Sequence, residues 1–596
     1  MRIHAAAVIA AAFNWLTAAP APAAPPRPNV VVILADDAGW GDFSFTGNTT
    51  LSTPAIDGLA RDGAVLTTFC VQPVCSPTRA ELLTGRSYPR TGVRGVSLGE
   101  ERMNADERTL ADLLAAAGYA TGCFGKWHNG TQWPLHPRAR GFATFEGFTE
   151  GHWADYFDAE IEHDGRFVKG SGYLADDLTS RAIGFIERQS AGPFFCYLAF
   201  NTPHSPMSVP DADWERFHDR EITRRGPDGD AEELAFTRAA LAMVENLDRN
   251  VGRLLAALDR AGRSRDTIVV FLSDNGPNSS RWCGGMRGRK GSTDEGGVRS
   301  VCCIRYPARI AAGTRVDEAA GAIDLVPTIC GLAGVPIPPD KPLDGIDLAP
   351  LLVGGPEAPA LAATLRGRPL IASWGGKVSV RTTRHRLDAQ GRLYDMEADP
   401  GQTRDIAAAE PAEAARLRAI AADWRRDVLE PARRRPDDPF PVGFPGAPHT
   451  ELPARDGRPQ GGITRSGRAP NSSFFTTWRT AEDAISWSVD VKQAGSYEAL
   501  LWYTCPAADA GATVELSCGD AAVAGRIDPG WDPPLEQGDD RVTRRQEGYS
   551  KEFRPLSLGV IDLPAGPGTL VLRATAIPGE QVADVRRLVL VPARDE

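Results

Sequence analysis

The sequence lacks an excess of positive charge. It contains 66 Lys and Arg residues against 77 Asp and Glu residues, which gives a formal net charge of −11 at pH 7. No Lys/Arg block of the kind that neutralises phosphate groups is present, so we expect no nucleic-acid partner. If the substrate is an anion, a local pocket must attract it, because the overall field repels it.

Long apolar segments are also missing. After the N-terminal stretch no run reaches the length needed to span a bilayer, so we expect no membrane span. The N-terminal stretch itself has Arg2, then an apolar run, then small residues around Ala19 to Ala24. This layout predicts a secretory signal peptide over residues 1–24 and a periplasmic or secreted protein. The alternative interpretation of the stretch is a disordered tail.

If Cys75 is reserved for chemistry, nine of the ten cysteines remain, and an odd number cannot all pair within one chain. An exported protein folds where cysteines can pair, and Cys505 and Cys518, which flank a predicted hairpin, are the expected disulfide. Cys302 and Cys303 are neighbours in a strand-like run. Their side chains should point to opposite faces and pack as small hydrophobic groups.

No internal repeat is visible, and the length predicts two or three folded units. From Pro28 onward, apolar runs alternate with amphipathic helical patterns, which predicts an α/β domain over residues 28–365 with a parallel sheet covered on both faces. Four of these runs end in polar residues, and ligands of such folds gather beyond the carboxyl ends of the strands. The runs are "NVVVILADD", "GYATGCFGKWH", "GPFFCYLAFNTPH" and "DTIVVFLSDNG".

Beyond residue 365 the pattern changes. Residues 366–432 are typical of an antiparallel meander followed by a helix, and thus of a small α+β subdomain. A stretch rich in Pro, Gly and Arg at 433–470 is typical of a linker. Residues 471–596 alternate polar and apolar residues without strong helical patterns, which predicts a separate β-sandwich.

Two of the strand ends are rich in oxygen ligands. Asp36 and Asp37 follow "VVVIL", and Asp274 and Asn275 follow "IVVFL". Carboxylate and amide oxygens without a local His or Cys favour a hard divalent ion, calcium more than magnesium or zinc. The alternative is that each Asp caps the following turn or helix.

Basic side chains follow other strands. In "GKWH" an extended backbone would point Lys126 and His128 to one side and Trp127 to the other. His204 follows a further strand, and Lys290 lies in a glycine-rich segment. Taken singly, the Lys126 and His128 pair is more typical of a solvated strand end, and His204 of a hydrogen-bonded loop histidine. The alternative for Lys290 is a mobile surface loop.

The segment "PVCSPTRAELLTG" places Cys75 at the start of a predicted helix. Pro77 suits a first helical turn, and Arg79 adds positive charge one turn along. These features would lower a thiol pKa, so a thiolate nucleophile is one interpretation, beside a disulfide or a packing role. A hard metal has no need of a soft sulfur ligand, however, and an oxygen species at position 75 would suit it better.

With these residues, the sequence resembles the type I sulfatases. "CSPTRAELLTG" is similar to their Cys-x-Pro-x-Arg signature and "GYATGCFGKWH" to their second signature, and "ADD", "LSDNGP", "RKGSTDEGGVR", "IDLVPTICGLAGV" and "LYDMEADPGQTRDI" resemble further landmarks in the same order. The match covers roughly residues 28–410. It implies an alkaline-phosphatase-like α/β fold with a small C-terminal α+β subdomain, to which the β-sandwich is appended.

The resemblance also implies a chemistry. A formylglycine-generating enzyme would oxidise Cys75 to Cα-formylglycine before the chain folds. One oxygen of the hydrated aldehyde would attack the sulfur of a sulfate ester, and the second hydroxyl would then release sulfate. A phosphoester or phosphonate hydrolase of the same superfamily, and a sugar-binding protein with a relic sulfatase domain, are the alternatives.

The family's roles carry over residue by residue. Arg79 would hold the formylglycine, His128 would be the base that eliminates sulfate, and His204 or Lys290 would protonate the leaving alcohol. The calcium ligands implied are Asp36, Asp37, position 75, Asp274 and Asn275, and the sulfate-binding residues implied are Lys126, His204 and Lys290. Arg287, Arg289 and residues 151–157 are further expected to face the substrate.

A sulfated carbohydrate is the expected substrate of this arylsulfatase-like chain. The expectation rests in part on the β-sandwich, whose aromatic residues could contact sugar. The alternative is that they pack in the core, as large aromatic residues usually do. These residues are Trp478, Trp487, Trp502 and Tyr503.

Overall fold

The computed structural model describes residues 27–189, 191–227, 229, 232–433, 438–536, 539–544 and 546–593. The expected signal peptide at 1–24 lies outside these residues. Among the helices that are described, none combines the length and apolar character needed to cross a bilayer.

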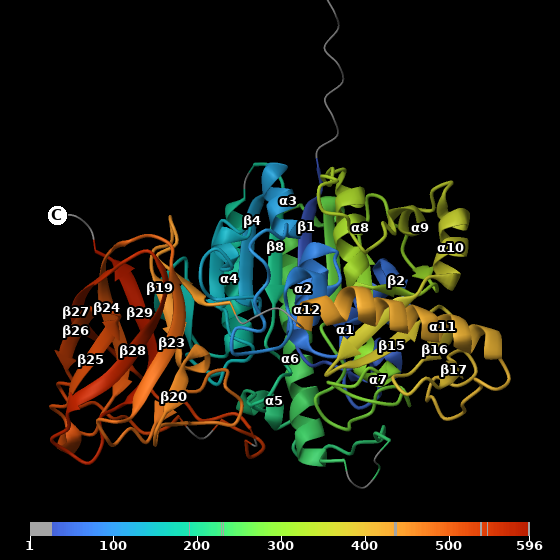
Figure 1. Ribbon diagram of the computed structural model, residues 1–596. Helices are drawn as coiled ribbons and strands as arrows, with labels where there is room; N and C mark the ends of the chain where they lie inside the picture. The colour runs from blue at the N-terminus through green and yellow to red at the C-terminus, as the bar shows by residue number, and fades with distance from the viewer. Residues whose placement is uncertain are drawn as a thin grey trace, which may run out of the picture.

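A ten-stranded sheet forms the centre of the larger domain (Figure 1), in the order β12–β2–β11–β9–β1–β8–β4–β5–β6–β7. The five strands from β9 to β5 are parallel, as expected, but β11, β6 and β7 pair antiparallel with their neighbours. The two-residue turn between β6 and β7 permits only an antiparallel pair. The strands are β1 (Asn29–Ala35), β2 (Ala64–Leu66), β4 (Ala120–Lys126), β5 (Thr144–Phe148), β6 (Glu160–His163), β7 (Arg166–Lys169), β8 (Phe194–Ala199), β9 (Thr267–Ser273), β11 (Cys302–Arg305) and β12 (Thr314–Val316).

Helices cover both faces of this sheet, and each face has its own hydrophobic core. One face packs against α2 (Cys75–Thr84), α3 (Leu110–Ala116) and α8 (Leu325–Ala333), and the other against α1 (Pro54–Asp62), α4 (Leu174–Arg188) and α6 (Leu234–Arg260). All seven residues of β1 are buried, which explains their continuous apolar character. Cys302 lies in one core and Cys303 in the other, which confirms the predicted packing of this pair.

The small subdomain that follows is an antiparallel meander covered by one helix. Its strands are β14 (Leu370–Trp374), β15 (Lys377–Arg381), β16 (His385–Leu387) and β17 (Leu393–Asp395), and its helix is α11 (Pro411–Trp424). A short sheet of β10 (Arg299–Ser300), β3 (Phe69–Cys70) and β13 (Ala320–Gly321) lies before it in the chain. The other α-helices of the described residues are α5 (Asp211–Trp214), α7 (Glu295–Val298), α9 (Ala349–Val353), α10 (Ala358–Gly367) and α12 (Glu430–Arg433).

The C-terminal part forms two six-stranded sheets around one core, drawn in orange and red in Figure 1. One sheet contains β18 (Phe440–Val442), β20 (Arg458–Gln460), β23 (Ala484–Val491), β25 (Thr513–Cys518), β26 (Ala521–Arg526) and β28 (Gly566–Ala576). The other contains β19 (Thr450–Pro453), β21 (Thr464–Arg465), β22 (Phe475–Thr476), β24 (Gly495–Thr504), β27 (Arg554–Leu563) and β29 (Asp584–Pro592).

The expectation of a linker at 433–470 is wrong from residue 440 onward. β18 and β20 pair with β23, and β19 pairs with β29. The prolines in this segment suggested a linker, yet β18, which contains Pro441, lies at the edge of its sheet, where proline is tolerated. Phe440, Val442 and Leu452 belong to the sandwich core.

The expected disulfide between Cys505 and Cys518 is also wrong. Cys505 directly follows β24 and Cys518 ends β25, but these strands belong to different sheets and do not form one hairpin. All ten cysteines are free and buried.

Candidate active site at the ends of the central strands

The acidic ends of β1 and β9 meet because these parallel strands are neighbours, with Ala35 opposite Ser273. The backbone N–H of Asp37 donates to Asp274 Oδ1 at 3.2 Å, and Asn275 Nδ2 donates to Asp37 Oδ1 at 2.8 Å. Asp36, Asp37, Asp274 and Asn275 are all fully buried. The fold thus concentrates three carboxyl groups and one amide beneath the protein surface.

Cys75 is the first residue of α2 and is 3 % exposed. Its Sγ and carboxylate oxygens of Asp36 and Asp274 lie within 4.8 Å of one another. Burial raises the pKa of the Cys75 thiol, and the nearby lysines offset this only in part, which argues against a resting thiolate. One turn later, Arg79 donates to Asp274 Oδ2 at 2.9 Å and to the Lys126 carbonyl at 2.9 Å.

Two lysines and a histidine surround the acidic groups. Lys126 Nζ donates to Asp36 Oδ2 at 2.7 Å, and Lys290 Nζ lies 2.7 Å from Asp37 Oδ1. His204 Nε2 is 3.6 Å from Asp37 Oδ2. The structure therefore brings together these three predicted basic residues, which the chain supplies from three separate segments.

His128 lies at the same site but not on an extended backbone. β4 ends at Lys126, and His128 has a φ of 64°, so the expectation of an extended "GKWH" segment is wrong. Trp127 nevertheless packs in the core, as expected. His128 Nε2 lies 2.8 Å from the Val96 carbonyl. Left-handed backbone at a non-glycine residue stores strain and is common at functional sites.

The electrostatics of the His128 ring favour its neutral form. Burial holds the pKa of His128 well below its usual range, and the positive charge of Lys126 adds to this effect. Its Nδ1 is buried and has no hydrogen-bond partner in the described part of the chain. A neutral imidazole with an unpaired ring nitrogen can accept a proton from a reacting group.

The oxygen atoms of the acidic cluster fit a hard cation. Asp36 Oδ1 and Asn275 Oδ1 are buried without a hydrogen-bond partner among the described residues. Burial raises the pKa of Asp274, and the neighbouring Asp36 carboxylate raises it further. A divalent cation held among these oxygens would satisfy the unpaired atoms and stabilise the carboxylates.

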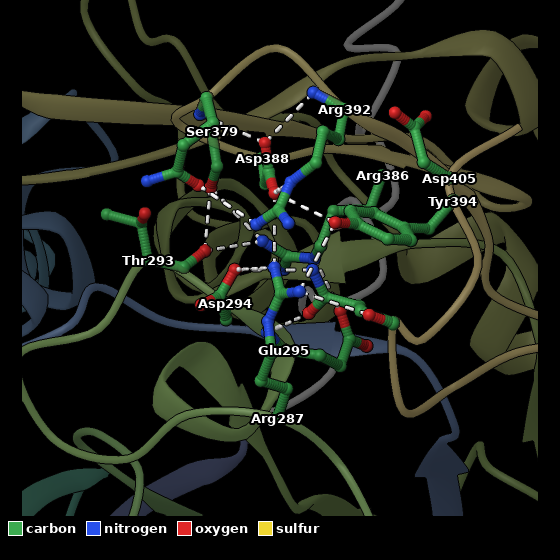
Figure 2. Close-up of polar contacts among 12 residues, drawn as sticks. Arg287, Thr293, Asp294, Glu295, Ser379, Arg386, Asp388, Arg392, Tyr394 and Asp405 are labelled. Atoms are coloured by element: carbon green, nitrogen blue, oxygen red, sulfur yellow. Dashed lines mark hydrogen bonds and ion pairs between the residues drawn. The ribbon is translucent and has the colours of Figure 1, made fainter. Parts of the chain in front are cut away.

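The segment that carries Lys290 is held by the small subdomain (Figure 2). Arg287 donates to Asp388 Oδ2 at 3.2 Å and to the Gln402 carbonyl at 3.0 Å, and Arg386 Nε donates to Glu295 Oε2 at 2.9 Å. Arg287 therefore contacts the subdomain, whereas the sequence led us to expect that it faces the substrate. Arg289 is exposed and donates to Ser280 Oγ.

Two residues at the site were not singled out from the sequence. The His152 ring stacks on His204 with centroids 5.5 Å apart, and its buried Nε2 has no partner among the described residues. Asn471 of the sandwich donates to the Val96 carbonyl at 3.2 Å, the same oxygen that His128 contacts. His152 lies in the stretch 151–157 expected to face the substrate, whereas nothing in the sequence links Asn471 to a residue 375 positions away.

The sandwich contacts the segments that carry both stacked histidines. Ser472 Oγ donates to the His152 carbonyl at 2.9 Å, and Glu547 accepts a hydrogen bond from Ser205, the residue after His204. Arg544 also donates to the Ala154 carbonyl at 3.2 Å. The sandwich is therefore part of the wall around the site.

Arg455 joins the sandwich to the larger domain and gives a test of this arrangement. It is 1 % exposed, donates to Thr131 Oγ1 at 2.6 Å and pairs with Glu101 at 3.2 Å. We expect Arg455→Met to lower the free energy of unfolding by about 3–5 kcal/mol, because it leaves buried carboxylates unpaired. Urea unfolding measures the loss. Arg479→Met, at an exposed position of the sandwich, should cost no more than about 0.5 kcal/mol, and equal losses in both variants would contradict the prediction.

Comparison with known proteins identifies the family. The family model described as Sulfatase matches residues 28–335. The chain belongs to the sulfatase family. It is 33% identical over 385 residues to N-acetylgalactosamine-6-sulfatase of Mus musculus, covering 59% of this chain and 71% of that protein. It is 36% identical over 370 residues to arylsulfatase A of Homo sapiens, and the match covers 56% of this chain and 69% of that protein. The protein is thus a sulfuric ester hydrolase.

Solved structures agree with the fold of this sulfatase. The crystal structure of Ps i-CgsB superposes with a TM-score of 0.61 at 29% identity, over 68% of this chain and 94% of that one. The phosphonate monoester hydrolase of Agrobacterium radiobacter superposes with a TM-score of 0.50 at 22% identity, over 68% of this chain and 96% of that one, which shows a shared fold alone. The alkaline-phosphatase-like fold expected from the sequence is confirmed.

Proposed function

We propose that the protein hydrolyses sulfate esters of a saccharide, with a Cα-formylglycine derived from Cys75 as nucleophile and a calcium ion as cofactor. The proposal rests mainly on the position of Cys75. Its Sγ lies among the carboxylates of Asp36 and Asp274 at the start of α2. Asp36, Asp37, Asp274 and Asn275 would hold the ion, with an oxygen at position 75 completing the set.

The two groups would supply the central chemistry. The hydrated formylglycine would supply one hydroxyl as the nucleophile toward sulfur and a second hydroxyl for the later release of sulfate, and calcium would polarise the oxygens around it. The side chains of this protein bind and orient. Arg79 fixes position 75 against the acidic cluster, and Lys126, Lys290 and His204 present positive charge or N–H groups to the sulfate oxygens.

Proton transfers fall to the histidines and a lysine. The unpaired Nδ1 of His128 suits it to take a proton when sulfate is released. His204 or Lys290 would give a proton to the leaving alcohol, since both lie beside Asp37 at the site.

The burial of Cys75 bears on how it is modified. At 3 % exposure, its side chain is out of reach of another enzyme in the folded protein. A formylglycine-generating enzyme must therefore act on the unfolded segment "CSPTR". This fits an exported chain that is modified before it folds, in keeping with the expected signal peptide and a periplasmic or secreted location.

Relatives support a sulfated carbohydrate as the substrate. The structure of Ps i-CgsB in complex with k-i-k-neocarrahexaose superposes with a TM-score of 0.60 at 29% identity. N-acetylgalactosamine-6-sulfatase is by its name a sulfatase of an amino sugar. We propose the same broad class, a sulfated saccharide or polysaccharide, for this chain.

Paired assays on an aryl sulfate and an aryl phosphate test the proposed activity. With protein produced alongside a formylglycine-generating enzyme, we expect kcat/KM on the sulfate to exceed that on the phosphate by about a hundredfold or more, because the site is complementary to one transition state. Faster cleavage of the phosphate would instead favour a phosphoester or phosphonate hydrolase.

A further inference from the structure

A cavity of about 240 Å³ lies between the larger domain and the sandwich. The larger domain contributes the hairpin of β6 and β7 and the segment around Trp153, and the sandwich contributes Trp502 and residues 550–553. None of the residues assigned above to the metal or to the sulfate lines it. It is therefore a separate space beside the active site, of a size suited to a single sugar ring.

Aromatic side chains form part of its wall. Among the four sandwich aromatics considered from the sequence, Trp478, Trp487 and Tyr503 are in the core. Trp502 is only half-buried and lines the cavity, where its ring meets the edge of Phe167 with centroids 5.9 Å apart. The Arg587 guanidinium lies over both rings, 3.7 Å from the Phe167 centroid and 4.8 Å from the Trp502 centroid. The remaining surface of the half-buried Trp502 ring is the flat apolar area on which the C–H face of a sugar can pack.

Trp153 supplies an unused hydrogen-bond donor. Its side chain lines the cavity and is only 7% exposed, and its indole Nε1 is buried without a hydrogen-bond partner among the described residues. The ring is fixed by stacking on Phe148, with centroids 5.0 Å apart. A buried N–H without an acceptor is costly, so a small shift of this side chain that lets a ligand hydroxyl oxygen reach the N–H would remove a penalty as well as form a bond.

The charged residues that line the cavity determine whether it favours a charged or an uncharged sugar ring. Lys551 pairs with Asp532 and Asp584, and Glu160 pairs with Arg587. All three partners lie outside the lining, so these two lining charges are already neutralised. The remaining balance is negative, which repels a sulfated ring and provides carboxylate acceptors for sugar hydroxyls. The acidic lining residues are Asp155, Asp158, Glu160, Glu536 and Glu552, and the basic ones are Lys169, Lys551 and Arg586.

The cavity is connected to the active site by direct contacts. Trp153 follows His152, whose ring stacks on His204. Arg586, which lines the cavity, donates to the Ser473 carbonyl at 2.9 Å, and the neighbouring Ser472 holds the His152 carbonyl. An occupant of the cavity thus lies along the same wall as the sulfate-binding residues.

We infer that this cavity is a subsite for an uncharged sugar unit of the saccharide that carries the sulfate ester. The inference rests on the proposed function, because it assigns a second part of the same substrate. It also explains why the sandwich is fastened to the larger domain: each domain supplies one of the two tryptophans.

Binding and kinetics of the full chain test the subsite. The probes are an array of uncharged hexasaccharides, which contains cello-, xylo-, manno- and agaro-oligosaccharides, and 4-nitrophenyl sulfate. We expect at least one hexasaccharide to bind, and Trp502→Ala to weaken that binding about tenfold while kcat/KM on 4-nitrophenyl sulfate stays unchanged. Trp153→Phe, which removes only the N–H, should weaken hexasaccharide binding as well.

Trp374→Ala is the matched control, because Trp374 is a half-buried tryptophan of β14 that does not line the cavity. It should leave hexasaccharide binding unchanged. The inference is overturned if no uncharged hexasaccharide binds, or if Trp502→Ala and Trp374→Ala behave alike. Failure of the proposed function is distinguishable, since it appears as absent hydrolysis of 4-nitrophenyl sulfate by the unaltered protein.

Discussion

Replacing Cys75 with alanine is expected to lower kcat/KM on an aryl sulfate by about 10⁴-fold or more, since it removes the covalent nucleophile. The loss should not come from unfolding. Cys75 is the first residue of α2, alanine is the best helix former, and the removal of one buried sulfur costs only a small part of the stability of a domain of this size.

Mass spectrometry of the peptide that spans Cys75 accompanies the assay. In active protein the peptide should carry formylglycine in place of cysteine, and circular dichroism should be the same for both proteins. Cys330→Ala is the matched control, because Cys330 is also a buried cysteine in a helix, α8, remote from the acidic cluster. A Cys75→Ala variant that kept full activity, or an active protein with an unmodified thiol, would refute the proposed nucleophile.

Much of the site was predictable because most of its parts lie at the end of a strand or the start of a helix. The acidic residues come directly after β1 and β9, and strands that are parallel neighbours bring such residues together. Cys75 begins a helix, so Arg79 falls on the same face one turn later. Local patterns of this kind identify residues before their distances are known.

What escaped prediction depends on backbone conformation or on contacts between distant segments. The left-handed backbone of His128 interrupts the strand pattern that "GKWH" suggests, and composition cannot reveal it. The contacts of Asn471 and Ser472 with the larger domain end on backbone carbonyls, which every residue possesses. Such contacts leave no mark in the sequence of the partner segment.

The sandwich illustrates how composition can mislead. The proline-rich stretch before residue 470 suggested a flexible linker, and a flexible linker would allow the sandwich to move independently. Instead β18 to β21 are strands of the sandwich itself, and buried Arg455 ties it to Thr131 and Glu101. The sandwich can then contribute to substrate recognition from a fixed position.

Removal of divalent ions is the second change for which we expect a large effect. A chelator should abolish sulfatase activity and lower Tm, because Asp36 Oδ1 and Asn275 Oδ1 are buried without a hydrogen-bond partner in the described part of the protein and like-charged carboxylates lie side by side. Calcium added at a hundredfold excess over its Kd stabilises the native state by about 2.7 kcal/mol. This should raise Tm by about 3 °C or more, and magnesium should do less because it resists giving up its water ligands.

Asp274→Asn tests whether the acidic cluster is the site of that effect. This variant should lose the calcium-dependent rise in Tm, which is a readout independent of catalysis. Asp62→Asn is the control, since Asp62 is an exposed aspartate whose carboxylate pairs with the adjacent Arg61, and it should keep the full rise. Because Asp274 also accepts hydrogen bonds from Arg79, its loss lowers the starting Tm as well. The informative quantity is therefore the difference in Tm between the chelated and the calcium-loaded protein. If Asp274→Asn keeps this difference in Tm, the ion binds elsewhere.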